Sequence, residues 1–334
     1  MKKIKIVLYG CGVMGRRIAQ ALHDKKSFTM VGAIDTSEEI VGKDLGELFN
    51  PPREIGVLVE NNPETICKKG NANAAILTTT SHLKSVLPQI IRCVKAGMNV
   101  VSTSEELSYP WKRNPEDARN IDKLSKEHGV TVVGTGINPG YLMDTLPLVL
   151  TAPCLQVDSI KVVRMMNSAN RRIPFQNKVG TGLTKEAFGE QIEKGIITGH
   201  VGLIESIYMI AEGLHWTLDE AIEMPADPVI AGEEIKTEVG TVSPGDVIGL
   251  TSKAIGKMDG REVIILDFNA FAGVGQEYDE IMINGVPSIH EKILGGVHGD
   301  LGTVAVTINT VPKVLEAPPG LVLMKDLPPV VATQ

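Results

Sequence analysis

Two adjacent glutamates, Glu105 and Glu106, follow an apolar run at residues 100–101 and are the first candidates for chemistry. If that run is a strand of a parallel sheet, its carboxyl end faces the crevice where such sheets bind ligands. A carboxylate there can hold a cationic amine, whose pKa is about 10, and then take its proton. On an extended chain adjacent side chains point to opposite sides, so we expect one glutamate to face a substrate. A solvated turn is the alternative interpretation.

A glycine motif, Gly-Cys-Gly-Val-Met-Gly, follows an apolar run at residues 4–9. Its first glycine allows a tight turn, its second lets the backbone approach a pyrophosphate, and its third lets a helix pack close to the strand. The pyrophosphate is expected over the start of that helix, where backbone N–H groups and the helix dipole favour negative charge. The motif predicts a dinucleotide site at Gly10, Gly12, Val13, Met14 and Gly15.

An acid, Asp35, ends the next apolar run at residues 31–34 and lies twenty positions after Gly15. An aspartate there can accept hydrogen bonds from the adenine-ribose hydroxyls and would repel a 2′-phosphate, so NAD is the expected cofactor. Arg16 and Arg17 keep NADP open.

Hydroxyl side chains follow two further predicted strands, at residues 73–77 and 99–101. At such strand ends they are placed to meet the nicotinamide ribose, although a Ser/Thr cap for the helix expected at residues 83–97 is an equal alternative. The predicted cofactor contacts from this set are Thr78, Thr79, Thr80 and Ser104. His82 is interpreted as a structural or cofactor-lining residue.

A third strand end, after residues 130–133, leads into the loop at residues 134–141, which holds three glycines. That composition indicates close approach of the backbone to a ligand. Asn138 offers an amide donor and acceptor that suit a carboxamide or an amine, and Tyr141 ends the loop as a candidate substrate residue. A plain loop is the alternative.

Alternating strands and helices in the first half predict an α/β architecture, a doubly wound, Rossmann-type parallel sheet. Longer strands with two hairpin signals, at residues 259–260 and 284–285, predict an α+β second domain with a mostly antiparallel sheet. We expect a dinucleotide-binding domain at residues 1–148, a substrate and dimerisation domain at 149–299, and a carboxy-terminal helix and tail at 300–334 that return to the nucleotide domain.

Composition narrows the class of partner. The 334 residues carry a net charge of −7 and are 43% hydrophobic, which fits a folded chain and gives no electrostatic reason to expect nucleic acid or an anionic membrane. The four cysteines are scattered without a C-x-x-C pair, so we expect no metal site and no disulfide framework. A small molecule is the expected partner and the cytoplasm the expected location.

An anionic substrate group would need a cation in the second domain. The predicted candidates, in a loop after a second-domain strand, are Arg171, Arg172 and Lys178, although a solvated loop face is the alternative. His200 and His298 lie between glycines, where pocket contact is open, but a lone histidine is more often structural.

Three segments together resemble the 2,4-diaminopentanoate dehydrogenases and the related native amine dehydrogenases: residues 77–82, 96–110 and 134–140, with Glu-Glu-Leu-Ser-Tyr-Pro at 105–110 as the specific part. The resemblance covers essentially the whole chain. It implies a fold like that of dihydrodipicolinate reductase, a homodimer formed through the second-domain sheet, and oxidative deamination of 2,4-diaminopentanoate to 2-amino-4-oxopentanoate and ammonia with NAD or NADP. It further implies that Glu105 is catalytic and that Asn138 takes part, which leaves Glu106 as a substrate contact.

Other dehydrogenase families are disfavoured by missing residues. Sugar dehydrogenases carry a lysine where the glutamates stand, dihydrodipicolinate reductase carries adjacent histidines, and a thioester-forming aldehyde dehydrogenase needs a cysteine beside a base. Two alternatives stay open: a dehydrogenase of another small amine or hydroxy compound, and a non-catalytic NAD sensor.

Overall fold

The computed structural model describes residues 3–169 and 171–333, which form two compact units. The first unit comprises Met1–Tyr141 and Gly299–Gln334, and the second comprises Leu142–His298. The first break therefore falls between residues 141 and 142, earlier in the chain than residue 148, where the sequence predicted the first domain to end. The reason is that helix α5 (Thr145–Leu150) packs on α8 (Leu203–Gly213) inside the second unit, where Leu148 contacts Gly213.

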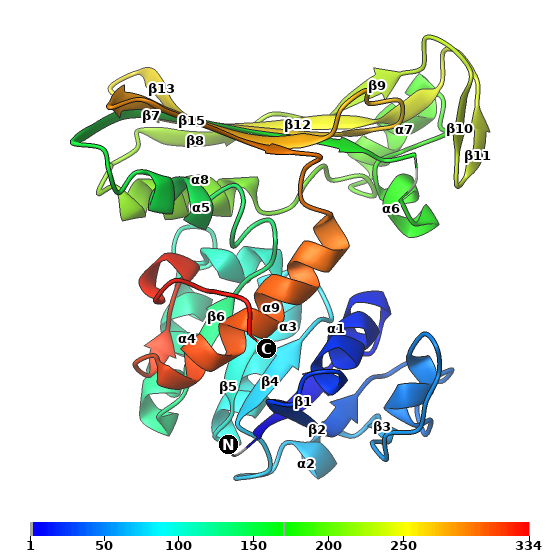
Figure 1. The fold of residues 1–334 in the computed structure, drawn as a ribbon, viewed down its shortest axis with the longest axis vertical. Coiled ribbons are helices and arrows are strands. Elements are labelled where there is room, and N and C mark those ends of the chain that lie inside the picture. The colour runs from blue at the N-terminus through cyan, green and yellow to red at the C-terminus, as the bar shows by residue number, and fades with distance from the viewer. Residues whose placement is uncertain (1–2, 170, 334) are drawn as a thin grey trace. The chain divides into compact units, whose positions relative to one another are not determined.

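The first unit alternates strands and helices along the chain (Figure 1). Its elements are β1 (Ile4–Tyr9), α1 (Val13–His23), β2 (Phe28–Ile34), η1 (Leu45–Leu48), β3 (Val59–Glu60), α2 (Pro63–Ile66), β4 (Ala74–Leu77), α3 (Leu83–Lys95), β5 (Asn99–Ser102), η2 (Glu105–Ser108), α4 (Pro115–His128), β6 (Thr131–Gly134), α9 (Gly299–Glu316), β16 (Gly320–Leu321) and η3 (Met324–Asp326).

These strands form one parallel sheet in the order β16-β6-β5-β4-β1-β2-β3. The order runs outward in both directions from the neighbours β1 and β4, so the switch point of a doubly wound sheet lies between them. Helices α1 and α9 pack together on one face, and α3 packs on α4 on the other. Because both faces are covered, every residue of β4 and β6 is buried, and the predicted parallel sheet is confirmed.

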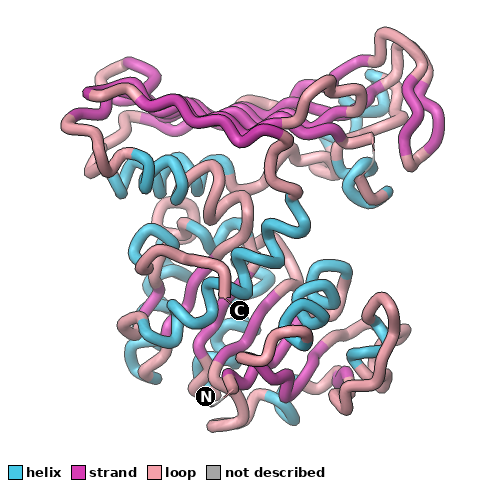
Figure 2. The backbone as a smooth tube through the Cα atoms, in the orientation of Figure 1, coloured by secondary structure: helices cyan, strands magenta, loops and turns pink. Residues whose placement is uncertain are grey.

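The second unit is built on a sheet of longer strands with helices on one side of it (Figure 2). Its further elements are β7 (Gln156–Asn167), α6 (Ile173–Lys178), α7 (Lys185–Glu193), β8 (Glu220–Glu223), β9 (Asp227–Ile230), β10 (Ile235–Thr237), β11 (Gly240–Val242), β12 (Val247–Met258), β13 (Arg261–Phe271), β14 (Tyr278–Val286) and β15 (Ile289–Leu294). The order is β15-β14-β7-β13-β12-β8, with β9 also paired to β12. The β7–β13 pair is parallel and the others are antiparallel, which confirms the predicted α+β unit.

The two predicted hairpin signals had different outcomes. Asp259 and Gly260, both with positive φ, form the tight turn between β12 and β13 as expected. The prediction of a turn at Asn284 and Gly285 was wrong, because β14 continues through both residues, which pair with β7. A register shift between them makes a bulge there instead.

Candidate functional site

The glycine loop after β1 has the local geometry of a dinucleotide site. Gly10 has φ +99°, and a Cβ on it would lie 2.9 Å from a Thr79 methyl carbon. A Cβ on Gly15 would lie 1.9 Å from the Gly10 carbonyl oxygen, so this glycine lets α1 pack against the loop. A Cβ on Gly12 would meet nothing within 4 Å, which leaves the backbone open to a ligand on that side. Gly10, Gly12 and Gly15 therefore have the three roles that a pyrophosphate-binding loop requires, namely the tight turn, the open approach of the backbone to the ligand and the close packing of the helix.

The amino terminus of α1 has backbone N–H groups that can bind an anion. Gly12 is its N-cap, and no side chain of the described residues caps the helix. No acid lies in the first turn, and the first helical bond runs from the Arg16 N–H to the Gly12 carbonyl at 2.9 Å. The preceding N–H groups, at Val13, Met14 and Gly15, are thus directed out of the helix start, where the helix dipole favours negative charge.

Asp35 lies directly after β2, beside this loop. Its Oδ2 accepts the Cys11 N–H at 2.6 Å, and its Oδ1 accepts the N–H groups of Thr36 at 2.8 Å and Ser37 at 2.9 Å. Because these bonds fix the carboxylate at the strand end with lone pairs remaining, it can also accept ribose hydroxyls. The loop, the helix start and Asp35 together fit a dinucleotide.

The predicted hydroxyl residues are engaged with the chain itself. Thr78 donates its hydroxyl to the Gly10 carbonyl at 2.7 Å, Thr79 donates to Gln89 at 2.7 Å, and Ser104 donates to the Ser81 carbonyl at 2.9 Å. The Thr80 hydroxyl oxygen accepts the His82 N–H at 3.3 Å. Thr78 ties β4 to the loop after β1 across the switch point, while cofactor contact by the four side chains stays a prediction.

The two glutamates follow β5 in the turn η2, and their surroundings differ. Glu106 is bonded through both carboxylate oxygens, to His82 Nδ1 at 3.0 Å and to the Leu83 N–H at 2.7 Å. Glu105 is half-buried, and its carboxylate has no hydrogen bond or ion pair within the described residues. Both residues lie in a 3-10 turn and not in the extended strand that the sequence indicated, so the expectation that one of them faces a substrate stays a prediction. Glu105 is therefore the carboxylate available to a ligand at this edge.

Asn138 and Tyr141 lie in the loop after β6, at the same edge of the first sheet, and both are half-buried. The Thr135 N–H donates to the Ser102 carbonyl at 2.8 Å, so this loop is held to the end of β5 just before the glutamates. Gly140 allows the loop to fold on itself, since a Cβ on it would lie 2.6 Å from the Gly136 nitrogen. Glu105 and Asn138 thus follow neighbouring strands, β5 and β6.

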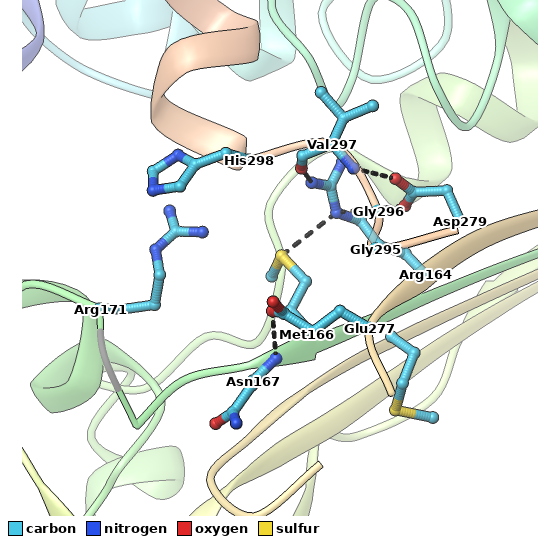
Figure 3. Close-up of a pocket in the computed structure, with 11 residues that line it drawn as sticks. Arg164, Met166, Asn167, Arg171, Glu277, Asp279, Gly295, Gly296, Val297 and His298 are labelled. Atoms are coloured by element: carbon cyan, nitrogen blue, oxygen red, sulfur yellow. Dashed lines mark hydrogen bonds and ion pairs between the residues drawn. The ribbon is translucent and has the colours of Figure 1, made fainter. Parts of the chain in front are cut away.

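The second unit holds a cavity of about 340 Å³ (Figure 3). Its ionisable lining residues are Arg164, Arg171, Glu277, Asp279 and His298, and Gly295, Gly296 and Val297 also line it. The Arg171 guanidinium lies 4.9 Å from the Phe175 ring centre and points toward His298 in Figure 3. Of the predicted anion partners, Arg171 lines this cavity, whereas Arg172 and Lys178 are not among its lining residues. Of the two histidines for which pocket contact was open, His298 lines the cavity and His200 does not.

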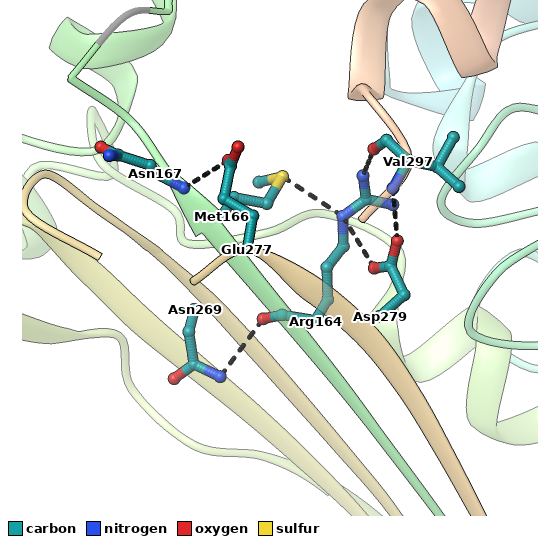
Figure 4. Close-up of polar contacts among 7 residues, drawn as sticks. All are labelled: Arg164, Met166, Asn167, Asn269, Glu277, Asp279 and Val297. Atoms are coloured by element: carbon teal, nitrogen blue, oxygen red, sulfur yellow. Dashed lines mark hydrogen bonds and ion pairs between the residues drawn. The ribbon is translucent and has the colours of Figure 1, made fainter. Parts of the chain in front are cut away.

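Arg164 is the main residue that the sequence reasoning missed. It is 1% exposed, donates to the Val297 carbonyl, and its Nε lies 3.6 Å from Asp279 Oδ1 (Figure 4). Its buried Nη1 has no hydrogen-bond partner among the described residues. Burial raises the pKa of Asp279, and burial lowers the pKa of Arg164, which nevertheless stays protonated. Residues 162, 164 and 166 lie on the same face of β7, because alternate residues of a strand share a face. An arginine between the apolar Val162 and Met166 was the signal available in the sequence.

Cys11 and Cys93 are buried, Cys67 and Cys154 are partly buried, and all four thiols are free. No cluster of three or more metal-ligating acids, histidines or cysteines occurs in residues 3–169 and 171–333. Over the same residues, the structure has no helix of the length and apolar character that crossing a membrane requires.

Comparison with known proteins identifies the family. Residues 141–334 match the model of the 2,4-diaminopentanoate dehydrogenase C-terminal domain, and residues 4–135 match that of the dihydrodipicolinate reductase N-terminus. The chain is 35% identical over 336 residues to the 2,4-diaminopentanoate dehydrogenase of Acetoanaerobium sticklandii, which covers 98% of this chain and 94% of that protein. The chain belongs to the 2,4-diaminopentanoate dehydrogenase family.

More distant relatives agree with this assignment. An amine dehydrogenase from Streptomyces virginiae is 22% identical over 97% of this chain and 96% of its own length. The solved amine dehydrogenase from Mycobacterium smegmatis superposes with a TM-score of 0.86 at 26% identity, over 99% of this chain and 98% of that one. Members of this family are NAD(P)-dependent oxidoreductases of the amine dehydrogenase class, and the resemblance read from residues 77–82, 96–110 and 134–140 is confirmed.

Proposed function

We propose that the chain catalyses the NAD-dependent oxidative deamination of 2,4-diaminopentanoate to 2-amino-4-oxopentanoate and ammonia, reversible as reductive amination. The proposal depends on the surroundings of Glu105, whose half-buried carboxylate has no partner in the described residues. Glu105 lies at the same edge of the first sheet as the dinucleotide loop. Membership of the family supports the substrate.

Glu105 acts first on the substrate amine and then on water. It holds the substrate ammonium as an ion pair and then removes a proton, because a nitrogen without a free lone pair cannot support departure of hydride from its carbon. The bound dinucleotide supplies the hydride acceptor. Glu105 passes this proton to solvent and, ionised again, takes a proton from the water that attacks the iminium carbon. It returns that proton to the nitrogen of the carbinolamine, and ammonia leaves as the hydroxyl proton goes to solvent and the ketone forms. Asn138, on the loop after the neighbouring strand, orients the amine through its amide.

The cavity of the second unit has side chains that suit an amino acid as a ligand. An amino acid carries a carboxylate and an ammonium group, and this cavity places guanidinium donors, Arg164 and Arg171, beside the carboxylates of Glu277 and Asp279. Guanidinium groups bind carboxylates through paired, charge-assisted hydrogen bonds. We propose that this cavity binds carboxylate groups.

NAD is the proposed cofactor in preference to NADP. The carboxylate of Asp35 is held at the end of β2 by three backbone N–H groups. A fixed anion there repels the additional phosphate of NADP and accepts the ribose hydroxyls of NAD.

The test is NAD reduction with 2,4-diaminopentanoate, a simple secondary alkyl amine and the matching secondary alcohol, for the wild type and Glu105→Gln. We expect the diamino acid to give the highest kcat/KM and Glu105→Gln to lose about 10²- to 10⁴-fold in kcat with NADH affinity nearly intact. Preference for the alcohol would indicate a hydroxy-compound dehydrogenase. Binding of NADH without turnover of any substrate would indicate a sensor.

We also propose that the chain forms a homodimer through the second-unit sheet. The β12–β13 face that packs on α8 includes Gly256 and Ile264, since a Cβ on Gly256 would lie 3.0 Å from Ile207. Alternation therefore places Ile255 and Ile265 on the opposite face. Across the described residues, Figure 2 shows no helix along that face, so a second copy is a suitable cover.

A further inference from the structure

Glu106 fastens the turn that carries Glu105 to the start of helix α3. Its Oε2 accepts the Leu83 N–H at 2.7 Å, and its Oε1 lies 3.0 Å from His82 Nδ1. The carboxylate thus caps α3 from a different segment, since the helix's own N-cap residue, His82, provides no side-chain cap. The Glu106 side chain is 18% exposed, so water competes little for these bonds.

The backbone around Glu106 is held to the same loop. The Glu106 N–H donates to the Ser81 carbonyl at 3.2 Å, and the Ser104 hydroxyl donates to that carbonyl at 2.9 Å. Gly134 of β6 supports the turn closely, because a Cβ there would lie 2.5 Å from the Leu107 carbonyl carbon. Glu105 lies between two residues whose side chains are both fixed.

We propose that Glu106 is a positioning residue that fixes the direction of Glu105. The inference rests on the proposed function, in which Glu105 is the catalytic carboxylate. Helix α3 packs on β4 and β5 and so provides a firm anchor. A carboxylate at its amino terminus is stabilised by the helix dipole as well as by the hydrogen bond. Since Glu105 and Glu106 share one short turn, the anchor of the second restricts the first.

The test compares Glu106→Ala with Glu106→Gln. The glutamine amide oxygen can still accept the Leu83 N–H, whereas alanine leaves it without this cap. We expect Glu106→Ala to lower kcat about 10- to 100-fold, as misplacement of a catalytic group does, with KM for NAD near that of the wild type. The kinetic isotope effect with substrate deuterated at the reacting carbon should rise, because hydride transfer becomes slower. Glu106→Gln should retain kcat within a few-fold of the wild type.

A matched control is Glu64→Ala. It removes a carboxylate that bonds the other end of α3, through Arg92 Nε at 2.8 Å, far along the helix from the glutamates. We expect wild-type kcat and isotope effect for this variant. Loss of activity here equal to that of Glu106→Ala would mean that any loosening of α3 suffices and would overturn the specific role of Glu106.

Two outcomes separate this inference from the proposed function. If the wild type deaminates the diamino acid and Glu106→Ala keeps its kcat, the positioning role fails and the function stands. If the wild type turns over no amine, the function fails, and the anchor is judged by hydrogen exchange of the Leu83 amide and of residues 103–108. Faster exchange in Glu106→Ala than in Glu106→Gln supports the anchor, and equal exchange overturns it.

Discussion

At the scale of residues, Glu105 and Glu106 show how neighbours of one type acquire different tasks. Glu106 is bonded to the start of α3, which leaves Glu105 as the carboxylate without a partner in the described part of the chain. The difference comes from what lies beside each side chain, namely the loop at residues 80–83, and not from their chemistry. The substrate role expected of Glu106 stays a prediction, and its bonds favour a supporting task.

Asp35 is expected to decide between the two nicotinamide dinucleotides. Asp35→Ala should weaken NADH binding about 10- to 100-fold, because charge-assisted bonds to the ribose hydroxyls are each worth about 1.5–3 kcal/mol. NADPH should lose less, since the repulsion of its phosphate is removed as well. Fluorescence titration gives both Kd values, and their ratio cancels any general loosening of the fold. Glu38→Ala, which removes a nearby exposed acid, should leave the ratio unchanged, and an unchanged ratio in Asp35→Ala would contradict the assignment.

His200 should make the stability of the protein depend on pH. Its ring stacks on Phe268 with centroids 4.2 Å apart, and burial, with Lys178 and Arg164 nearby, lowers its pKa to about 3. Between pH 6.5 and 3 the unfolded chain therefore binds a proton that the folded chain does not, so stability falls as the pH drops through 6.5. From pH 7 to pH 5 this group should cost the wild type about 2 kcal/mol in the free energy of unfolding.

Urea titrations at pH 7 and pH 5 measure this effect. His200→Leu should lose that part of the pH dependence, so its stability relative to the wild type should improve by about 2 kcal/mol at the lower pH. Phe268→Leu is the control, because it removes the stacking partner and keeps the histidine. A difference between wild type and His200→Leu that stays constant with pH would refute the prediction.

At the scale of elements, two similar dipeptides have different outcomes. Asp259 and Gly260 connect strands that pair with one another, so positive φ at both residues closes a hairpin. Gly285 lies opposite Val157 of β7, and a Cβ on it would be 2.1 Å from the Gln156 carbonyl oxygen. The second glycine therefore serves the close approach of two backbones. Pairing with β7, a strand far away in the sequence, makes this dipeptide a bulge and not a turn.

Strand β16, in the proline-rich segment after α9, is another element that a distant strand determines. Gly320 and Leu321 form β16 at the edge of the first sheet, with the Gly320 N–H donating to the Val130 carbonyl at 3.0 Å. The side chain of Asp122 on α4 accepts the Leu321 N–H at 3.1 Å. Prolines suit the edge of a sheet, where a missing N–H removes no ladder bond. Residues 320–321 form a strand because they pair with β6.

At the scale of the whole molecule, the homodimer is open to a direct test. Light scattering at micromolar concentration should give about twice the mass of the 35.9 kDa chain. Ile265→Asp should raise the dissociation constant at least about 10-fold, because a charge would be buried in the interface. Leu58→Asp, at an exposed aliphatic position of the first unit, should leave the mass unchanged. A monomeric wild type, or an unaltered mass for Ile265→Asp, would exclude this interface.

The sequence by itself determined the dinucleotide unit. Three glycines, Asp35 and the alternating apolar runs are local features, and the doubly wound sheet arranges such features in one way. The strand ends that carry Glu105 and Asn138 followed from the same pattern. These predictions depended on steric and periodic rules that act over a few residues.

Only the tertiary structure decided which glutamate is bonded, where the second unit begins and how Arg164 is held. Each answer depends on residues far apart in the chain: Leu83 with Glu106, Leu148 with Gly213, and Arg164 with Asp279 and Val297. Hydrogen bonds and close packing across such separations leave no periodic signal in the sequence. They arise only when the sheets bring their strands together.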